Sequence, residues 1–99
     1  MNYIYRWNGE YFGFISGNNF FDANSNWVGW VEGNQVWRAN GEFLGEIYQG
    51  KYILRKTAII PPVPRIPHVR PVTPVPPVPP VNRIGRPPLV GLEDALEDL

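Results

Sequence analysis

Side chains that could carry chemistry are scarce in this chain. It has no cysteine and one histidine, His68, which lies among prolines. One histidine without cysteine is too little for a zinc site, which takes several such ligands. The acids Glu10 and Glu42 occupy the same position of an internal repeat, where they could meet as the carboxylate pair of a glycoside hydrolase. Acids beside turns are ordinarily solvated, so we expect no enzyme activity, no cofactor and no metal site.

The repeat that positions these acids has a period of about 16 residues and spans residues 1–60. Three turn pairs recur within it: Asn8-Gly9, Asn24-Ser25 and Asn40-Gly41. Asn-Gly is the preferred pair of the two-residue type I′ hairpin turn. Three further pairs mark turns between the repeats: Gly17-Asn18, Gly33-Asn34 and Gln49-Gly50. The runs between turns are rich in aromatic and β-branched residues, so the pattern predicts an all-β antiparallel meander of at least seven strands.

Two-residue turns fix the register of the strands and therefore the face on which each side chain lies. One face is predicted to carry Tyr5, Phe12, Phe14, Phe21, Val28, Trp30, Trp37, Leu44 and Ile53. The other is predicted to carry Ile4, Tyr11, Ile15, Phe20, Trp27, Val31, Val36, Phe43, Ile47 and Tyr52. Both faces are apolar, whereas a sheet with one wet face alternates apolar and polar residues. We therefore expect the sheet to curl around one face and something else to cover the other.

Three glycines recur on the second face, at Gly13, Gly29 and Gly45. Each is predicted to lie opposite a large residue of the preceding strand, for which a glycine leaves room over the backbone.

The units with Asn-Gly turns, the glycine four residues after each turn and the proline-rich C-terminal extension resemble the bacterial four-fold β-flower domain proteins. The resemblance covers roughly residues 3–60 and implies four hairpin-like units arranged as petals about a pseudo-four-fold axis. It implies no biochemical activity. A fourth unit begins at Tyr52 and then departs from the pattern, with Ile59 and Pro61 at the aromatic and glycine positions. The predicted fold is therefore a four-fold flower or a small barrel.

All 12 prolines lie in residues 61–88, which define a proline-rich arm over residues 61–90. Proline fixes its own φ and moves the preceding residue out of the α region, so the arm is predicted to adopt polyproline II. This conformation has three residues per turn, and an aliphatic residue recurs every three residues of the arm. Eight side chains therefore form a predicted aliphatic stripe: Val63, Ile66, Val69, Val72, Val75, Val78, Val81 and Ile84.

A solvated linker has no use for such a stripe, whereas proline-rich ligands dock onto aromatic rings. The aromatic residues all lie between Tyr3 and Tyr52, in the part whose surface needs covering. We therefore expect the arm to dock on its own domain, on a second copy of the chain or on a foreign partner. The alternatives are a mobile linker and, from the Pro-x-x-Pro spacing, a mimic of an SH3 ligand.

Residues 91–99 are predicted to form a short acidic amphipathic helix or a frayed tip. Leu92, Ala95, Leu96 and Leu99 would share one helical face. So short a helix is not stable alone in water, so it would fold in a partner's groove.

Charge and hydropathy narrow the class of partner. The formal net charge is zero, with a balanced repeat region, a basic arm and an acidic tip. A domain that binds nucleic acid normally presents a basic face, so nucleic acid is not the expected partner. No apolar run is long enough to span a membrane and no signal peptide is visible, so we expect a cytoplasmic protein. A small chain without disulfides often gains stability by oligomerisation, so we expect a homo-oligomer.

The sequence thus favours a non-catalytic protein-binding or assembly module, in which the apolar surface of the repeats engages a proline-rich arm. The arm could belong to the same chain, a neighbouring subunit or a partner. The alternative is a β domain that binds a carbohydrate or small ligand by stacking it on exposed tryptophan or tyrosine rings. The predicted partner-binding residues are Trp7, Phe14, Trp30, Trp37, Tyr48, Val63, Ile66, Val69, Val72, Val75, Val78, Val81, Leu92, Leu96 and Leu99.

Overall fold

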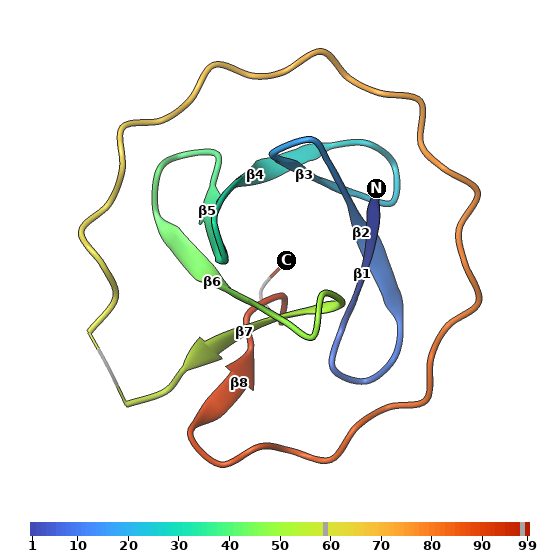
Figure 1. Ribbon diagram of the computed structural model, residues 1–99, viewed down its shortest axis with the longest axis vertical. Coiled ribbons are helices and arrows are strands. Elements are labelled where there is room, and N and C mark those ends of the chain that lie inside the picture. The colour runs from blue at the N-terminus through green and yellow to red at the C-terminus, as the bar shows by residue number, and fades with distance from the viewer. Residues whose placement is uncertain (59, 98) are drawn as a thin grey trace.

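Eight strands follow one another in a single antiparallel sheet, in which each strand pairs with its neighbours in sequence. The computed structural model describes residues 1–58, 60–97 and 99, so Ile59 and Asp98 lie outside the described residues. The strands are β1 (Asn2–Tyr5), β2 (Tyr11–Ser16), β3 (Asn19–Asp22), β4 (Trp27–Glu32), β5 (Gln35–Arg38), β6 (Phe43–Tyr48), β7 (Tyr52–Lys56) and β8 (Leu92–Asp94). The sheet curls around a centre near which the C-terminus lies (Figure 1). The predicted all-β antiparallel meander is confirmed.

The first three hairpins, β1–β2, β3–β4 and β5–β6, end in tips of the same form. In the first tip, the Arg6 N–H donates to the Glu10 carbonyl oxygen at 2.8 Å, and the Gly9 N–H donates to the Arg6 carbonyl oxygen at 2.9 Å. Gly9 has a φ of 94°, whereas Asn8 has no positive φ. This is a three-residue loop with a glycine bulge, so the predicted two-residue type I′ tip is wrong. Ser25 (φ 64°) and Gly41 (φ 93°) take the place of Gly9 in the next two tips.

The tip loops, together with a second bulge inside each of these strand pairs, move six side chains to the opposite face from the one predicted. Three of them, Tyr11, Trp27 and Phe43, lie directly opposite Tyr5, Phe21 and Trp37 and therefore share their face. The other three are Phe12, Val28 and Leu44. The register shifts by one residue between Ile4 and Tyr5, and equivalent shifts occur in the β3–β4 and β5–β6 pairs. A bulge places two residues of one strand opposite one residue of its partner, so the extra residue turns over. Phe12 and Leu44 consequently join the central core, and Val28 packs against it.

The third turn between repeats differs from the first two. Gly17-Asn18 and Gly33-Asn34 form the predicted two-residue turns, since Ser16 pairs with Asn19 and Glu32 pairs with Gln35. After β6, however, Tyr48 pairs with Tyr52, which leaves three residues in the turn. A one-residue slip moves every side chain of a strand to the other face. Ile53 therefore lies in the central core and not on the predicted outer face.

The fourth hairpin is completed from the C-terminal end of the chain. β8 pairs with β7 through Leu54↔Asp94, Arg55↔Glu93 and Lys56↔Leu92. The loops of the other hairpins comprise residues 6–10, 23–26 and 39–42, whereas residues 57–91 connect β7 to β8. The predicted helix or frayed tip over residues 91–99 is wrong, because pairing with β7 supplies the backbone hydrogen bonds that so short a helix cannot sustain alone.

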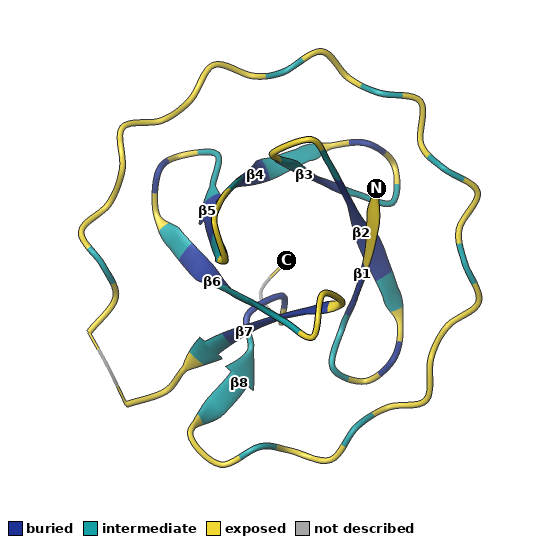
Figure 2. Ribbon diagram, viewed as in Figure 1, coloured by how far each residue is buried: buried dark blue, intermediate teal, exposed yellow. Residues whose placement is uncertain are grey.

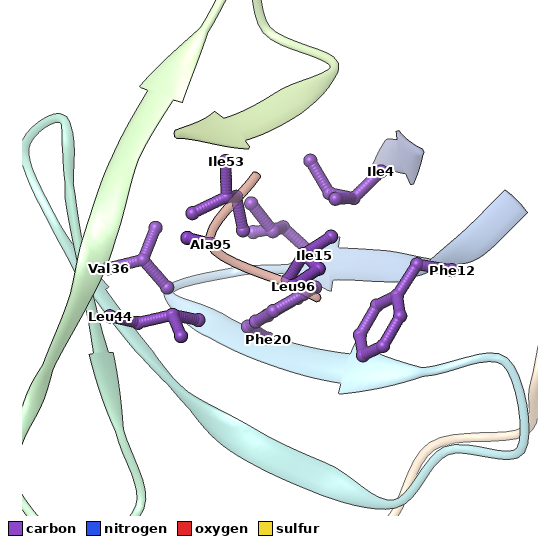
Figure 3. Close-up of a cluster of buried hydrophobic side chains, with 9 residues drawn as sticks. All are labelled: Ile4, Phe12, Ile15, Phe20, Val36, Leu44, Ile53, Ala95 and Leu96. Atoms are coloured by element: carbon purple, nitrogen blue, oxygen red, sulfur yellow. The ribbon is translucent and has the colours of Figure 1, made fainter. Parts of the chain in front are cut away.

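The central core contains residues from all four hairpins and from the C-terminal segment. Its buried members are Ile4, Phe12, Ile15, Phe20, Val36, Leu44, Ile53, Ala95 and Leu96 (Figure 3). The Ala95 N–H donates to the Ile53 carbonyl oxygen at 3.0 Å, which holds the C-terminal turn inside the curled sheet. A second cluster lies where β7 meets β1, around Tyr5, Tyr52 and Leu54.

The arm leaves β7, passes around the outside of the curled sheet and returns to β8 (Figure 1). Its described residues, 60–90, contain no helix or strand. The molecule measures 37 × 35 × 21 Å and is therefore flattened. The arm forms a ring around the rim of this flattened body (Figure 1). No helix in the described part of the chain is long and apolar enough to cross a membrane.

Candidate functional site

The contact between arm and body involves one residue in every three of the arm. We call this set the inner row: Pro62, Arg65, His68, Pro71, Pro74, Pro77, Pro80, Arg83, Arg86 and Leu89. Its prolines are half-buried, and these half-buried positions recur along the ring in Figure 2. The residue after each member of the row is exposed, as are the residues between.

The aliphatic stripe therefore points away from the body. Every one of its side chains is at least 84% exposed. The prediction that the arm lies on its own domain through this stripe is wrong, because the row beside the stripe makes the contact. The inner row contains prolines, arginines and a histidine, all of which pack well on the faces of aromatic rings.

Two hairpin tips hold the arm through the same pair of interactions. At the β5–β6 tip the Arg65 N–H donates to the Gly41 carbonyl oxygen at 2.7 Å, and the Arg65 guanidinium lies 4.7 Å from the centroid of the Trp37 ring. At the β1–β2 tip the Arg83 N–H donates to the Gly9 carbonyl oxygen at 2.7 Å. The Arg83 guanidinium lies 5.6 Å from the centroid of the Tyr5 ring. We call these two sets of interactions the tip contacts.

Gly9 and Gly41 are needed both for the positive φ of their turns and for the close approach of the arm. A Cβ on Gly9 would lie 1.9 Å from the Arg83 carbonyl oxygen, and a Cβ on Gly41 would lie 1.9 Å from that of Arg65. The arm therefore approaches the tips more closely than any other residue type would allow.

Between the tip contacts the arm covers rings that lie on the outside of the sheet. The His68 ring stacks on Trp30 with centroids 3.7 Å apart and planes at 15°. Trp30 and its cross-strand neighbour Trp37 are only 2% and 1% exposed. Phe14 and Phe21 stack on each other at 5.3 Å and are also buried, although neither belongs to the two core clusters. The four rings are thus buried on the side of the sheet around which the arm runs.

The arm is fixed again where it returns to the sheet. The Arg86 N–H donates to the Trp7 carbonyl oxygen at 3.0 Å, and the Trp7 Nε1–H donates to the Pro87 carbonyl oxygen at 2.8 Å. The Arg86 guanidinium lies 4.8 Å from the Trp7 ring and 5.7 Å from the Tyr52 ring. Tyr48 packs edge-on against Trp7, with centroids 5.8 Å apart.

The predicted partner-binding residues fall into three groups. Trp7, Phe14, Trp30, Trp37 and Tyr48 lie on the body and are buried or half-buried, and the aliphatic stripe is exposed. Leu92 is half-buried against the second cluster, and Leu99 is 37% exposed.

One of the predicted roles is wrong. Leu96 was expected on a partner-binding face but is fully buried in the central core, because the C-terminal turn enters the curled sheet. Trp30 and Trp37 are buried, whereas Trp7, the third tryptophan of the predicted set, is half-buried.

The arm residues that make the contacts were not among the predicted partner-binding residues. Arg65, His68, Arg83 and Arg86 all belong to the inner row. The signal that could have found them is their shared spacing of three with the prolines of the same row.

The acids considered for catalysis are bound within their own tips. The Glu10 carboxylate lies 3.6 Å from Arg6 Nε, and the Glu42 carboxylate accepts a hydrogen bond from Asn40 Nδ2 at 2.8 Å. Burial raises the pKa of Tyr11, and Tyr3 and Tyr5 raise it further, so its phenol is neutral at pH 7.

Replacing Gly41 with alanine is expected to detach the arm from the β5–β6 tip. The matched control is Gly33→Ala, because Gly33 also has a positive φ (60°) but has no atom within 4 Å of the added Cβ. The control should lose about 1–3 kcal/mol of unfolding free energy through backbone strain alone. Gly41→Ala should lose more and should also increase acrylamide quenching of tryptophan fluorescence. Equal losses and equal quenching in both variants would show that the tip contact holds nothing.

Comparisons with known proteins bear on this arrangement. Searches of curated proteins and of solved structures found no match to the chain. The family model described as 4-fold beta flower protein matches residues 1–89, which include the first seven strands and all but the last residue of the arm. The match therefore extends well beyond the region of roughly residues 3–60 in which the sequence resemblance was found. Because this match covers most of its length, the chain belongs to the 4-fold beta flower protein family.

Proposed function

We propose that this chain is a non-catalytic protein-binding or assembly module, in which a body of four hairpins of about 16 residues engages a polyproline II arm. The observation that carries the proposal is the burial of Phe14, Phe21, Trp30 and Trp37 on the outer side of the sheet. Buried rings on a convex surface need a cover, and the inner row lies over two of them, with His68 on Trp30 and Arg65 on Trp37. The arm is therefore a bound ligand of its own body.

The spacing of the tip contacts supports a polyproline II arm on a four-fold body. Arg65 contacts the β5–β6 tip and Arg83, 18 residues later, contacts the β1–β2 tip, which is two hairpins away. Each hairpin therefore corresponds to about nine arm residues, or three turns of polyproline II. With this spacing Pro74 would face the β3–β4 tip, which lies between the other two. Four hairpins correspond to about 36 residues, which is the separation of Lys56 and Leu92 in the sequence. Those two residues pair directly in β7 and β8.

A ligand held by its own body can also be exchanged between bodies. The arm makes its contacts through a few ring, arginine and histidine pairs, each worth about 0.5–1.5 kcal/mol. Loosening them exposes the body surface and the inner row together, and each is complementary to the other. Assembly through arm exchange between copies is therefore part of the proposed function.

The double variant Arg65→Ala with His68→Ala tests the proposal. It uncovers Trp37 and Trp30, so we expect a loss of about 1–3 kcal/mol in urea unfolding, stronger acrylamide quenching and association that rises with concentration in sedimentation velocity. Arg70→Ala is the control, because Arg70 is an exposed arginine of the same arm outside the inner row. A double variant that unfolds, quenches and sediments like the wild type would contradict the proposal.

A further inference from the structure

The outward side of the arm presents hydrophobic–proline pairs in tandem. Val75-Pro76 and Val78-Pro79 are all exposed, with Val75 at 89% and Val78 at 86%. We call these four residues the outer ridge. A large exposed apolar surface on a folded protein usually marks an interaction site.

We propose that the outer ridge docks into an aromatic-lined groove of a partner protein that binds polyproline II helices. The inference rests on the proposed function, because it assumes that the body holds the arm in this conformation. It goes beyond the proposed function by naming the face of the arm that binds and the chemistry of its partner.

The spacing of the outer ridge suits such a groove. Grooves of this class are lined by aromatic rings and accept prolines three residues apart in a polyproline II helix. Pro76 and Pro79 have this spacing, and each follows a valine that is exposed with it. The ridge therefore presents two equivalent hydrophobic–proline units side by side, one turn apart.

The body fixes the direction in which the ridge points. Pro74, Pro77 and Pro80 belong to the inner row and are half-buried, so they cannot serve a second groove. These three prolines alternate with the residues of the outer ridge along the arm. When the prolines contact the body, the outer ridge therefore points away from it. A ligand that is already held in its bound conformation loses less entropy on binding, so the body pre-organises the arm for the partner.

Charge along the arm indicates the character of the groove. Residues 71–82 include no charged residue, so the part of the groove that receives the ridge is neutral and apolar. Arg70 is exposed just before this stretch, and in the described part of the chain it has no ion pair or ring contact. Arg65, Arg83 and Arg86 all lie over rings of the body. Arg70 is thus available for an acidic group at the edge of the partner's groove.

A second copy of the chain is a poor occupant for the ridge. The arm runs around a convex rim (Figure 1), and two convex rims meet over only a few residues. A stable interface buries about 800 Å² on each partner, which such a contact does not reach. Of the aromatic rings that a second copy could offer, Phe14, Phe21, Trp30 and Trp37 are buried in its own fold.

The test is titration of the full chain with a panel of isolated SH3 and WW domains, followed by isothermal calorimetry. We expect saturable binding with a Kd below about 1 mM for at least one domain. The double variant Val75→Asp with Val78→Asp should weaken that binding about tenfold or more. The matched control is Val81→Asp with Ile84→Asp, which places the same charges on exposed residues of the same stripe, outside any hydrophobic–proline pair and away from Arg70, and should keep the affinity within about twofold.

Both double variants replace exposed side chains and should melt like the wild type. Absence of binding across the panel overturns the inference, as does equal weakening by the two double variants. Self-association of the wild type that only the Val75 and Val78 variant abolishes also overturns it, in favour of a second copy. These outcomes leave the proposed function standing, since that function fails on the Arg65 and His68 variant.

Discussion

Replacing Leu96 with alanine is expected to cost about 2–5 kcal/mol of unfolding free energy and to lower the melting temperature by about 10 °C or more. Leu96 is fully buried among residues of every hairpin, so truncation leaves a cavity at the centre of the curled sheet (Figure 3). The total stability of a domain this size is about 5–15 kcal/mol, so the loss is a large fraction of it. Thermal melting followed by circular dichroism measures the change.

Leu99→Ala is the control for this variant. Leu99 is the same residue type in the same C-terminal segment but is 37% exposed, so we expect a loss below about 1 kcal/mol. A frayed C-terminal tip would give two equally small losses, and that result would refute the closure of the fourth hairpin by β8.

The position of Leu96 matters for the arm as well as for the core. Residues 57–91 are tethered at both ends, by β7 and by β8, and they close a ring only while these two strands remain paired. Arg6 reinforces the closure, because its guanidinium donates to the carbonyl oxygens of Leu96 and Leu99 at 2.6 and 2.7 Å. Loss of the C-terminal segment would free one end of the arm and expose the rings beneath it.

The parts of the fold that are set by neighbouring residues in the sequence could be predicted, whereas the parts that depend on packing of the whole core could not. Gly17-Asn18 and Gly33-Asn34 connect strands directly, and their residue types gave the observed register. Asn8-Gly9 was misassigned because a two-residue turn and a three-residue loop with a glycine bulge both place glycine at a positive φ. The choice between them moves Phe12 from one face to the other, and packing of the whole core decides it.

The pairing of β8 with β7 could not be predicted from local signals. Leu54 and Asp94 lie far apart in sequence, and residues 92–94 show none of the aromatic and glycine pattern of the repeat. The segment was therefore assigned a helix from its leucine spacing. An unpaired strand edge at β7 was the missing clue, since such an edge attracts a pairing segment.

The face of the arm that binds was misassigned for a different reason. A spacing of three residues identifies rows along the arm, and two of these rows are suited to aromatic rings. The valines of the aliphatic stripe offer apolar area, whereas Arg65 and His68 offer interactions with the ring faces. On the body, Trp37 receives Arg65 and Trp30 receives His68, and the two rings take up these positions only in the folded sheet.

Replacing Gly29 with alanine is expected to unfold the protein, with a loss of more than about 4–5 kcal/mol. Gly29 lies opposite Phe20 as predicted, but the reason for glycine is not the bulk of that side chain. An added Cβ would lie 1.7 Å from the Trp37 carbonyl oxygen, which belongs to the backbone of the next strand. The backbone cannot withdraw without breaking the β4–β5 pairing, and Trp37 would carry its contact with Arg65 away with it.

The other repeat glycines and Gly33 complete this test. A Cβ on Gly13 would lie 2.0 Å from the Phe21 carbonyl oxygen, so its alanine variant should fail as severely. At Gly45 the nearest atom is the Leu54 carbonyl oxygen at 2.7 Å, so the loss should be smaller. Gly33→Ala adds a Cβ that has no neighbour within 4 Å and should leave a folded protein. Urea unfolding of the soluble variants orders the losses, and a Gly29→Ala protein as stable as Gly33→Ala would show that β4 and β5 do not approach each other as closely as this fold requires.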